Sequence, residues 1–205
     1  MRVFVALDIN DAIRDRLQLF MDGVRGFAPE ARWVRPESMH VTLKFIGEKP
    51  PEAVEEIKQS LARIQAAIFE ISFRDDGFFP SSKAPRVFWV GIEAGPELAA
   101  LAKSVDETTS VLGIPKEEHA FSAHLTLARR GGSGASRSRK SDDPTGSFRR
   151  LQERLATMPV PEFGTMTARE FFLYQSQLMR GGSRYMKIGC FGLSQRDTGT
   201  ATRIK

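Results

Sequence analysis

The chain has 205 residues, 41% of them apolar and 27% charged, so it is long enough for one sizeable core and has the composition of a soluble globular protein. It contains no apolar run of the roughly 18 residues that a membrane helix requires and no signal peptide, so we expect a cytoplasmic protein without a membrane partner. A single cysteine excludes an internal disulfide, and the net charge of +5 suits an anionic partner.

Strand and helix patterns follow one another irregularly along the chain. Residues 2–8 alternate between two faces, which is the period of a strand, and a helix capped by Asn10 or Asp11 follows to about Val24. Further strands are expected at 32–34, 39–46, 68–74, 86–93 and 123–129, and further helices at 53–64, 97–112 and 148–157. The last two strands, 165–175 and 184–193, are expected to form a hairpin around 179–183.

This order of elements predicts an α+β fold with antiparallel sheets rather than a doubly wound parallel sheet. No glycine-rich phosphate loop follows the first strand and no Walker sequence occurs, which argues against the common nucleotide-triphosphate and dinucleotide enzymes. We expect one domain over residues 1–194, with a mobile, basic, low-complexity loop at 131–147 and a flexible tail at 195–205.

Two of the three histidines stand in nearly identical tetrapeptides, His40-Val-Thr-Leu and His124-Leu-Thr-Leu. For this composition, Thr-Leu two and three places after a given histidine is roughly a one-in-several-hundred event. Both tetrapeptides lie in expected strands, where side chains at i and i+2 share a face and are about 6.5–7 Å apart. His40 therefore shares a face with Thr42, and His124 with Thr126.

The residue types in this pattern suit acid–base chemistry on a phosphoryl group. If the two strands are neighbours, one imidazole can accept a proton while the other donates one, and the hydroxyls can hydrogen-bond phosphoryl oxygens. The alternate residues Val41, Leu43 and Phe45 are expected in the core. No close cluster of metal-ligating residues accompanies either motif, so neither a metal nor any other cofactor is expected.

Five blocks spread over nearly the whole chain carry a resemblance: RVFVALDI, WVRPESMHVTLKFIGE, PRVFWVGI, FSAHLTLAR and LYQSQLMRGGSRY. They resemble the RNA 2′,3′-cyclic phosphodiesterases, historically called 2′-5′ RNA ligases, of the two-histidine phosphoesterase superfamily. The resemblance implies two pseudo-symmetric lobes around a central cleft, with helices on the outer faces and one motif in each lobe. One departure is Ala123, which precedes the second motif where the family often has proline.

The implied reaction is metal-independent hydrolysis of an RNA 2′,3′-cyclic phosphate terminus to a 2′-phosphate. The resemblance assigns proton donation to His40, activation of water to His124, and phosphate binding to Thr42 and Thr126. The residues alone do not order the two histidine roles. We expect a monomer acting on RNA ends, such as those of tRNA fragments.

Two basic residues near the motifs are further candidates for substrate contact. Arg129 lies five residues past His124 and could meet a phosphate or base, although strict alternation places it on the opposite face unless the strand ends or twists there. Lys44 shares a face with His40 and Thr42 in the same alternation, so it is expected either at the edge of the site or in solvent.

Phe4 and Tyr185 are candidates for stacking on a base, with a core position as the alternative. The residues leave three other functions open. The same site could join RNA ends in the 2′-5′ direction or open a small cyclic nucleotide, and the chain could instead bind RNA without catalysis.

Overall fold

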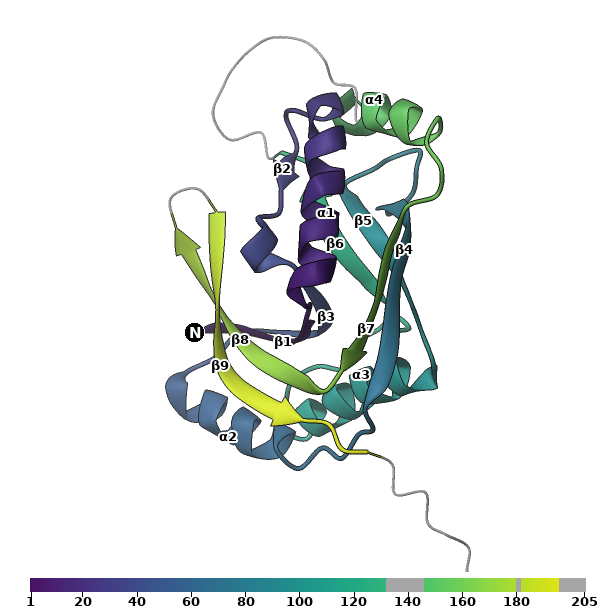
Figure 1. Ribbon diagram of the computed structural model, residues 1–205. Helices are drawn as coiled ribbons and strands as arrows, with labels where there is room; N and C mark the ends of the chain where they lie inside the picture. Colours follow the sequence, from purple (N-terminus) through teal and green to yellow (C-terminus); the bar gives the residue numbers. More distant parts are fainter. Residues whose placement is uncertain (132–145, 180–181, 196–205) are drawn as a thin grey trace, which may run out of the picture.

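The computed structural model describes residues 1–131, 146–179 and 182–195, so most of the loop expected at 131–147 and of the tail expected at 195–205 lies outside the described residues. The described strands form two antiparallel sheets, and four α-helices pack against them (Figure 1). This arrangement confirms the expected α+β class. No helix in the described part of the chain is both long and apolar enough to cross a membrane.

The first sheet contains four strands in the order β3-β1-β8-β9, and the second contains five in the order β2-β6-β5-β4-β7. The strands of the first sheet are β3 (His40–Glu48), β1 (Arg2–Asp8), β8 (Glu170–Met179) and β9 (Gly182–Gly192). Those of the second are β2 (Arg32–Trp33), β6 (His124–Arg129), β5 (Val87–Ala94), β4 (Phe69–Phe79) and β7 (Glu162–Ala168). The helices are α1 (Asp11–Val24), α2 (Pro51–Leu61), α3 (Pro96–Ser110) and α4 (Gly146–Leu155).

The two sheets repeat one pattern. In the first, β1 and β3 are antiparallel neighbours joined through α1, and in the second β5 and β6 are antiparallel neighbours joined through α3. The strand order β3-β1-β8-β9 then corresponds to β6-β5-β4-β7. Each half therefore presents one histidine strand, β3 or β6, beside the first strand of its own strand–helix–strand unit.

Each of these units places its helix against the opposite sheet, which joins the halves in one core. Arg16 of α1 donates a hydrogen bond of 2.9 Å to the carbonyl of Phe163 in β7, and the Phe20 ring packs edge-on against the Phe163 ring at 5.2 Å. In the other direction, Asp106 of α3 forms an ion pair with Lys44 of β3.

The strand expected at 165–175 is two strands in two sheets, which corrects the sequence prediction. The chain leaves β7 at Ala168 and enters β8 at Glu170, while the carbonyl of Arg169 between them accepts a hydrogen bond of 2.7 Å from the Leu193 amide. The alternating pattern runs unbroken through this point, so nothing in it marks the change of sheet. The closing hairpin is therefore β8–β9, and its turn at 180–181 is outside the described residues.

Candidate active site

The first histidine strand has the face parity that the sequence predicts. His40 and Thr42 are half-buried on one face of β3, opposite Asp8 and Ala6 of the antiparallel neighbour β1. Val41 between them is fully buried on the other face. The imidazole and the hydroxyl of this motif therefore point away from the core on the same side of the first sheet.

The second histidine strand repeats the arrangement. His124 and Thr126 are half-buried on one face of β6, opposite Gly91 and Trp89 of β5. Leu125 between them is fully buried. The same alternation thus presents an imidazole and a hydroxyl from each half of the molecule.

A β-bulge follows the first motif and changes the predicted facing of the next residues. The pairing of β3 with β1 skips Leu43, so Leu43 and Lys44 both point toward the core, and Phe45 returns to the face that carries His40. A bulge places two residues of one strand opposite one residue of its partner, which reverses the alternation beyond it. The expected core position of Phe45 is therefore wrong.

Lys44 does not reach the site, contrary to the sequence prediction. Its side chain is 1% exposed, forms an ion pair with Asp106 of α3, and donates a hydrogen bond of 2.9 Å to the carbonyl of Pro115. The Asp106 carboxylate also accepts a hydrogen bond of 3.1 Å from the Glu117 amide. Lys44 therefore connects the first histidine strand to the segment that leads into the second.

The second motif is followed by the same irregularity. The pairing of β6 with β5 skips Leu127, so Leu127 and Ala128 are both fully buried and Arg129 is exposed on the face of His124. The prediction that Arg129 lies on the opposite face is wrong, because the bulge inserts one residue into the alternation. Arg129 thereby becomes part of the site's surroundings.

The two histidine strands lie next to each other where the sheets meet, with Cα atoms of β3 and β6 within 8 Å (Figure 1). The electrostatics agree, because the charges of His124 and Arg129 both act on His40. The structure therefore brings together the two imidazoles and Arg129, and with them the two threonines that share their faces.

Each imidazole is oriented by the backbone. His40 Nδ1 lies 2.8 Å from the carbonyl oxygen of Ser38, and His124 Nδ1 lies 2.8 Å from the carbonyl oxygen of Ser122. Because a carbonyl oxygen only accepts, the proton of each neutral ring is on Nδ1. Each Nε2 therefore carries a lone pair available to a substrate.

Aromatic rings enclose His40 more than His124. The centroids of Phe4, Tyr185 and Tyr174 lie 4.7, 5.2 and 6.0 Å from that of His40. Phe4 is 3% exposed, so the core alternative applies to it and its ring supports the imidazole. Tyr185 is half-buried and meets His40 edge-on.

Both imidazoles are shifted toward the neutral form. The pKa of His40 is lowered to about 4; burial is the largest cause and the positive charges of Arg129 and His124 add to it, while the Ser38 carbonyl and Asp8 oppose it. Burial and Arg129 also lower the pKa of His124, against the Ser122 carbonyl. Two neutral imidazoles therefore face the site at neutral pH.

An ionic cluster that the sequence analysis missed lies beside His40. Burial alone would raise the pKa of Asp8, but its carboxylate accepts hydrogen bonds from Lys187 and, at 3.1 Å, from Arg14, and these contacts lower the pKa below its usual value. Asp8 is opposite His40 in the register of β1 and β3. Only the register of β1 and β3 reveals that Asp8 is a neighbour of His40.

A second neighbour that the sequence analysis missed is Phe79, whose ring packs edge-on against His124 with the centroids 4.9 Å apart.

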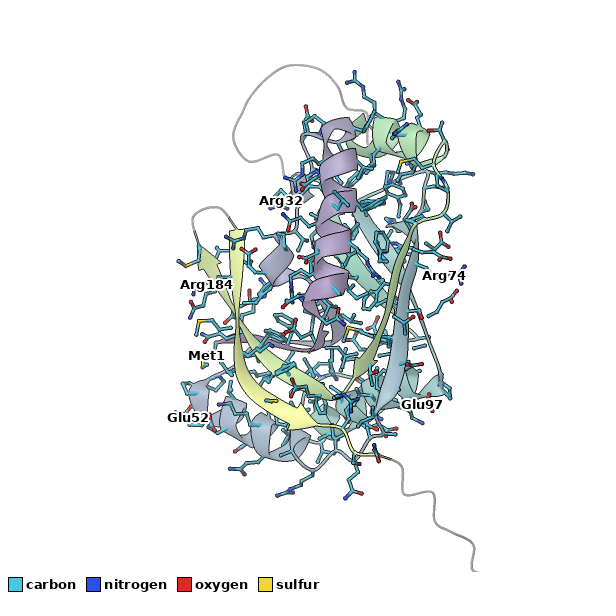
Figure 2. All side chains as sticks on the ribbon, in the orientation of Figure 1. Met1, Arg32, Glu52, Arg74, Glu97 and Arg184 are labelled. Atoms are coloured by element: carbon cyan, nitrogen blue, oxygen red, sulfur yellow. The ribbon has the colours of Figure 1, made fainter. Side chains whose placement is uncertain are left out.

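Charge is distributed unevenly around this region. Arg32 of β2 pairs with Arg129 of β6, and both residues are exposed. In Figure 2, Arg32 and Arg184 lie toward the end of the molecule formed by β2 and the β8–β9 hairpin, away from Glu52 on α2 and Glu97 on α3. The exposed charge beside the second motif is thus positive.

In the part of the chain that the structure describes, no metal-ligating cluster and neither of two surface hollows includes the histidine pair. Within the described ranges, no three His, Cys, Asp or Glu side chains are placed to hold a metal ion together. Hollows of about 410 and 470 Å³ lie along α3, one against the end of α2 and one against the segment around Ala66. Neither histidine lines these hollows, so we place the candidate chemistry at the meeting of β3 and β6.

Comparison with known proteins agrees with this geometry. The family model described as LigT-like phosphoesterase matches residues 7–89. A protein of Archaeoglobus fulgidus named RNA 2′,3′-cyclic phosphodiesterase is 34% identical over 191 residues, which cover 93% of this chain and 99% of that protein. The chain belongs to the LigT-like phosphoesterase family.

Other members of the LigT-like family extend the likeness over both motifs. A Methanothermobacter thermautotrophicus protein, also named RNA 2′,3′-cyclic phosphodiesterase, is 29% identical over 94% of this chain and 98% of its own. Escherichia coli LigT, crystallised in complex with 3′-AMP, superposes with a TM-score of 0.74 at 26% identity, over 95% of this chain and 98% of that one. The sheets and the histidine strands thus belong to the shared fold.

Proposed function

We propose that this LigT-like protein hydrolyses RNA 2′,3′-cyclic phosphate termini to 2′-phosphate ends, by acid–base catalysis through His40 and His124. One observation carries the proposal: two imidazoles on neighbouring strands, each with Nδ1 bound to a backbone carbonyl and each sharing its strand face with a threonine. The names of the two relatives support the choice of substrate.

In the proposed step, a water oxygen attacks phosphorus while the bond between phosphorus and the 3′ oxygen breaks. His124 Nε2 accepts the proton of the water, and protonated His40 donates its Nε2 proton to the departing 3′ oxygen. The product has a 2′-phosphate and a 3′-hydroxyl. Proton exchange with solvent then restores both histidines. Thr42 and Thr126 donate hydrogen bonds to the phosphoryl oxygens.

Two features of the surroundings favour this order of roles. Asp8 lies opposite His40 and opposes the lowering of its pKa by burial, so it supports protonation of His40 when the phosphate is bound. Among the described residues, three rings, including those of Phe4 and Tyr185, pack against His40, whereas one ring packs against His124, so we assign the activation of water to the less enclosed His124. A bound phosphate anion adds negative charge and raises the pKa of both imidazoles.

The positive charge beside the second motif suits an RNA strand. Arg129 is exposed on the face of His124 and its charge lowers the pKa of both histidines, so we assign to its guanidinium the role of holding the anionic phosphate between them. Arg32, its neighbour in the sheet, extends the positive charge toward the preceding nucleotides. We propose that the chain acts as a monomer, and that it needs no metal because the two imidazoles supply the proton transfers.

The test is product analysis with an RNA oligonucleotide that ends in a 2′,3′-cyclic phosphate. We expect a 2′-phosphate product, the same rate in EDTA, and a loss of roughly 10²–10⁴ in kcat for His40→Ala or His124→Ala. His119→Ala is the matched control, because His119 is an exposed histidine outside both motifs and its loss leaves the rate unchanged.

The remaining alternatives give different products in the same assay. A 2′-5′ joined RNA would identify a ligase, and turnover of a cyclic mononucleotide alone would identify a small-molecule phosphodiesterase. Binding of the RNA without any product would identify a non-catalytic RNA-binding module. Near-normal activity of either histidine variant would reject the two-histidine mechanism.

A further inference from the structure

Lys44 is a charged side chain in an interior position. Among the residues that the structure describes, it is the one lysine, arginine, aspartate or glutamate that is buried. Lysine is almost never fully buried unless its ammonium group is paired. The proposed reaction makes no use of this charge, so another role must account for its burial.

The fold itself does not require a charge at this position. Lys44 follows His40 by four residues, and the residue that follows His124 by four is Ala128. Lys44 and Ala128 each stand just beyond the bulge of their strand, and both are buried. The two halves thus share the bulge that turns this residue inward, and only the first half uses it to bury an ammonium group.

The ammonium group of Lys44 binds two parts of the chain. It forms an ion pair with Asp106 of α3, which packs against β3, and donates a hydrogen bond of 2.9 Å to the carbonyl of Pro115. The same oxygen of Asp106 accepts a hydrogen bond of 3.1 Å from the Glu117 amide. Burial alone would raise the pKa of Asp106, but the hydrogen bonds from Lys44 and the Glu117 amide lower it, so the carboxylate is ionised.

These contacts join the two strands that carry the histidines. Lys44 lies in β3 together with His40. Pro115 and Glu117 lie in the segment between α3 and β6, and this segment leads directly into His124. A shift of the segment relative to β3 would therefore move one imidazole relative to the other.

The proposed reaction is sensitive to the separation of the imidazoles. The water that enters and the 3′ oxygen that leaves are on opposite sides of phosphorus, so the base and the acid must each reach their own oxygen at the same time. Displacing a reacting group by about 1 Å can lower a rate by on the order of 10²-fold. A contact that fixes the two histidine strands relative to each other thus contributes to kcat without touching the substrate.

We propose that Lys44 and Asp106 are positioning residues that set the separation of the imidazoles of His40 and His124. This inference rests on the proposed phosphodiesterase function and extends it to the core beneath the site. Well-packed apolar side chains of similar volume often stabilise a core as well as a buried ion pair does, because neither has to leave water as a charge. The hydrogen bonds to Pro115 and from Glu117 supply what apolar packing lacks, which is a fixed direction for each contact.

Two variants separate positioning from stability. The double variant Lys44→Met with Asp106→Leu replaces the ion pair by apolar side chains. Its urea midpoint should stay or rise, while kcat on a cyclic-phosphate RNA falls by roughly 10- to 100-fold with KM unchanged. Asp106→Asn keeps the oxygen that accepts from Lys44 and from the Glu117 amide but removes the charge that balances the ammonium group. It should lower the urea midpoint and retain most of kcat.

Inorganic phosphate gives a measurement that does not depend on turnover. A phosphate held between the imidazoles of the parent protein should shift the NMR signals of both rings with one dissociation constant. In the double variant only one ring should respond, because a single anion no longer reaches both. If the parent protein hydrolyses no cyclic-phosphate RNA, the proposed reaction fails, while this titration still decides whether the ion pair sets the separation.

The double variant Lys103→Met with Glu107→Leu is the matched control, because this pair also lies on α3 but its side chains are 75% and 55% exposed. It should leave kcat and the phosphate response unchanged. Parent-like kcat in the variant without the buried pair would overturn the positioning role, as would a parent protein in which phosphate does not shift both rings. If kcat followed the urea midpoint in that variant and in Asp106→Asn, the pair would serve stability alone.

Discussion

The half of the molecule that carries His40 and the half that carries His124 share their backbone and differ in their side chains. In both, a histidine donates from Nδ1 to a carbonyl two residues earlier, a threonine follows on the same face, and a bulge follows the threonine. In the first half, aromatic rings and Asp8 surround the histidine, whereas Phe79 and Arg129 adjoin the second. A repeated backbone thus presents two imidazoles in unequal surroundings, which is what separate acid and base roles require.

The prediction with the largest expected effect tests whether the unequal surroundings of His40 and His124 make the first the proton donor and the second the base. A substrate whose 3′ oxygen is replaced by sulfur has a leaving group that needs no proton. It should restore most of the loss of roughly 10²–10⁴ in His40→Ala and little of that in His124→Ala. Single-turnover rates on the two substrates measure this. Equal restoration of both variants would erase the proposed distinction, and restoration of His124→Ala alone would reverse it.

The next prediction concerns stability and the buried Lys44, which has Ala128 at the corresponding position of the other half. Asp106→Ala leaves the Lys44 ammonium buried without its partner, so we expect the free energy of unfolding to fall by about 3–5 kcal/mol. Lys44→Met should cost less, because Asp106 is 20% exposed and can be hydrated. Urea denaturation measures both.

The exposed pair Lys103–Glu107 on the same helix provides the control for the buried pair. Glu107→Ala should change the free energy of unfolding by no more than about 0.5 kcal/mol. If Asp106→Ala were as mild as Glu107→Ala, the buried connection between the halves would have no energetic importance.

The enclosure of His40 predicts a pH dependence of stability. Its pKa is about 4 in the folded protein, against about 6.5 for an unfolded histidine. Between these values the unfolded state binds more protons, so stability decreases as the pH falls from 6.5 toward 4, by up to about 3 kcal/mol. His40→Gln should flatten this decrease in urea unfolding at several pH values, and His119→Gln should not. A parallel decrease in all three proteins would mean that His40 is not the group responsible.

The smallest expected effect concerns Arg129, which acts on both halves. Removing its charge in Arg129→Gln raises the pKa of both histidines, so the pH profile of kcat/KM should move to higher pH. Its maximum should also fall by about tenfold, because one charge-assisted hydrogen bond to the phosphate is lost. Arg149→Gln, on the exposed side of α4, should leave the profile in place. An unshifted profile in Arg129→Gln would place the guanidinium outside the site.

The residues that the sequence placed well are those whose position depends on local pattern. Alternation in residues 40–43 and 124–127 is enough to put each histidine and threonine on one face, and the capping of α1 by Asn10 follows from its side chain. The α+β class could likewise be predicted, because it follows from the order of elements. These predictions use residues that are close together in the sequence, so they do not depend on which strands pair.

The wrong predictions share one cause. Lys44, Phe45 and Arg129 were assigned by continuing the alternation past a bulge, and a bulge is visible only in the pairing of two strands. The division at Arg169 and the position of Asp8 opposite His40 likewise depend on long-range pairing. The local sequence pattern therefore predicts which side chains of each motif share a face. The residues that surround the motifs can be identified only once the pairing of the strands is known.

The carbonyl bonds to His40 and His124 have a consequence for how variation in this protein can be interpreted. The groups that orient the two imidazole rings are the backbone carbonyls of Ser38 and Ser122. Replacing the serine side chains should therefore leave the tautomer of each histidine unchanged. A saturation mutagenesis scan would therefore find no third residue that behaves like the orienting aspartate of a serine protease. Activity should instead be lost most strongly on insertion or deletion of one residue between each serine and its histidine. Such a change moves the carbonyl that orients the imidazole while leaving every catalytic side chain present.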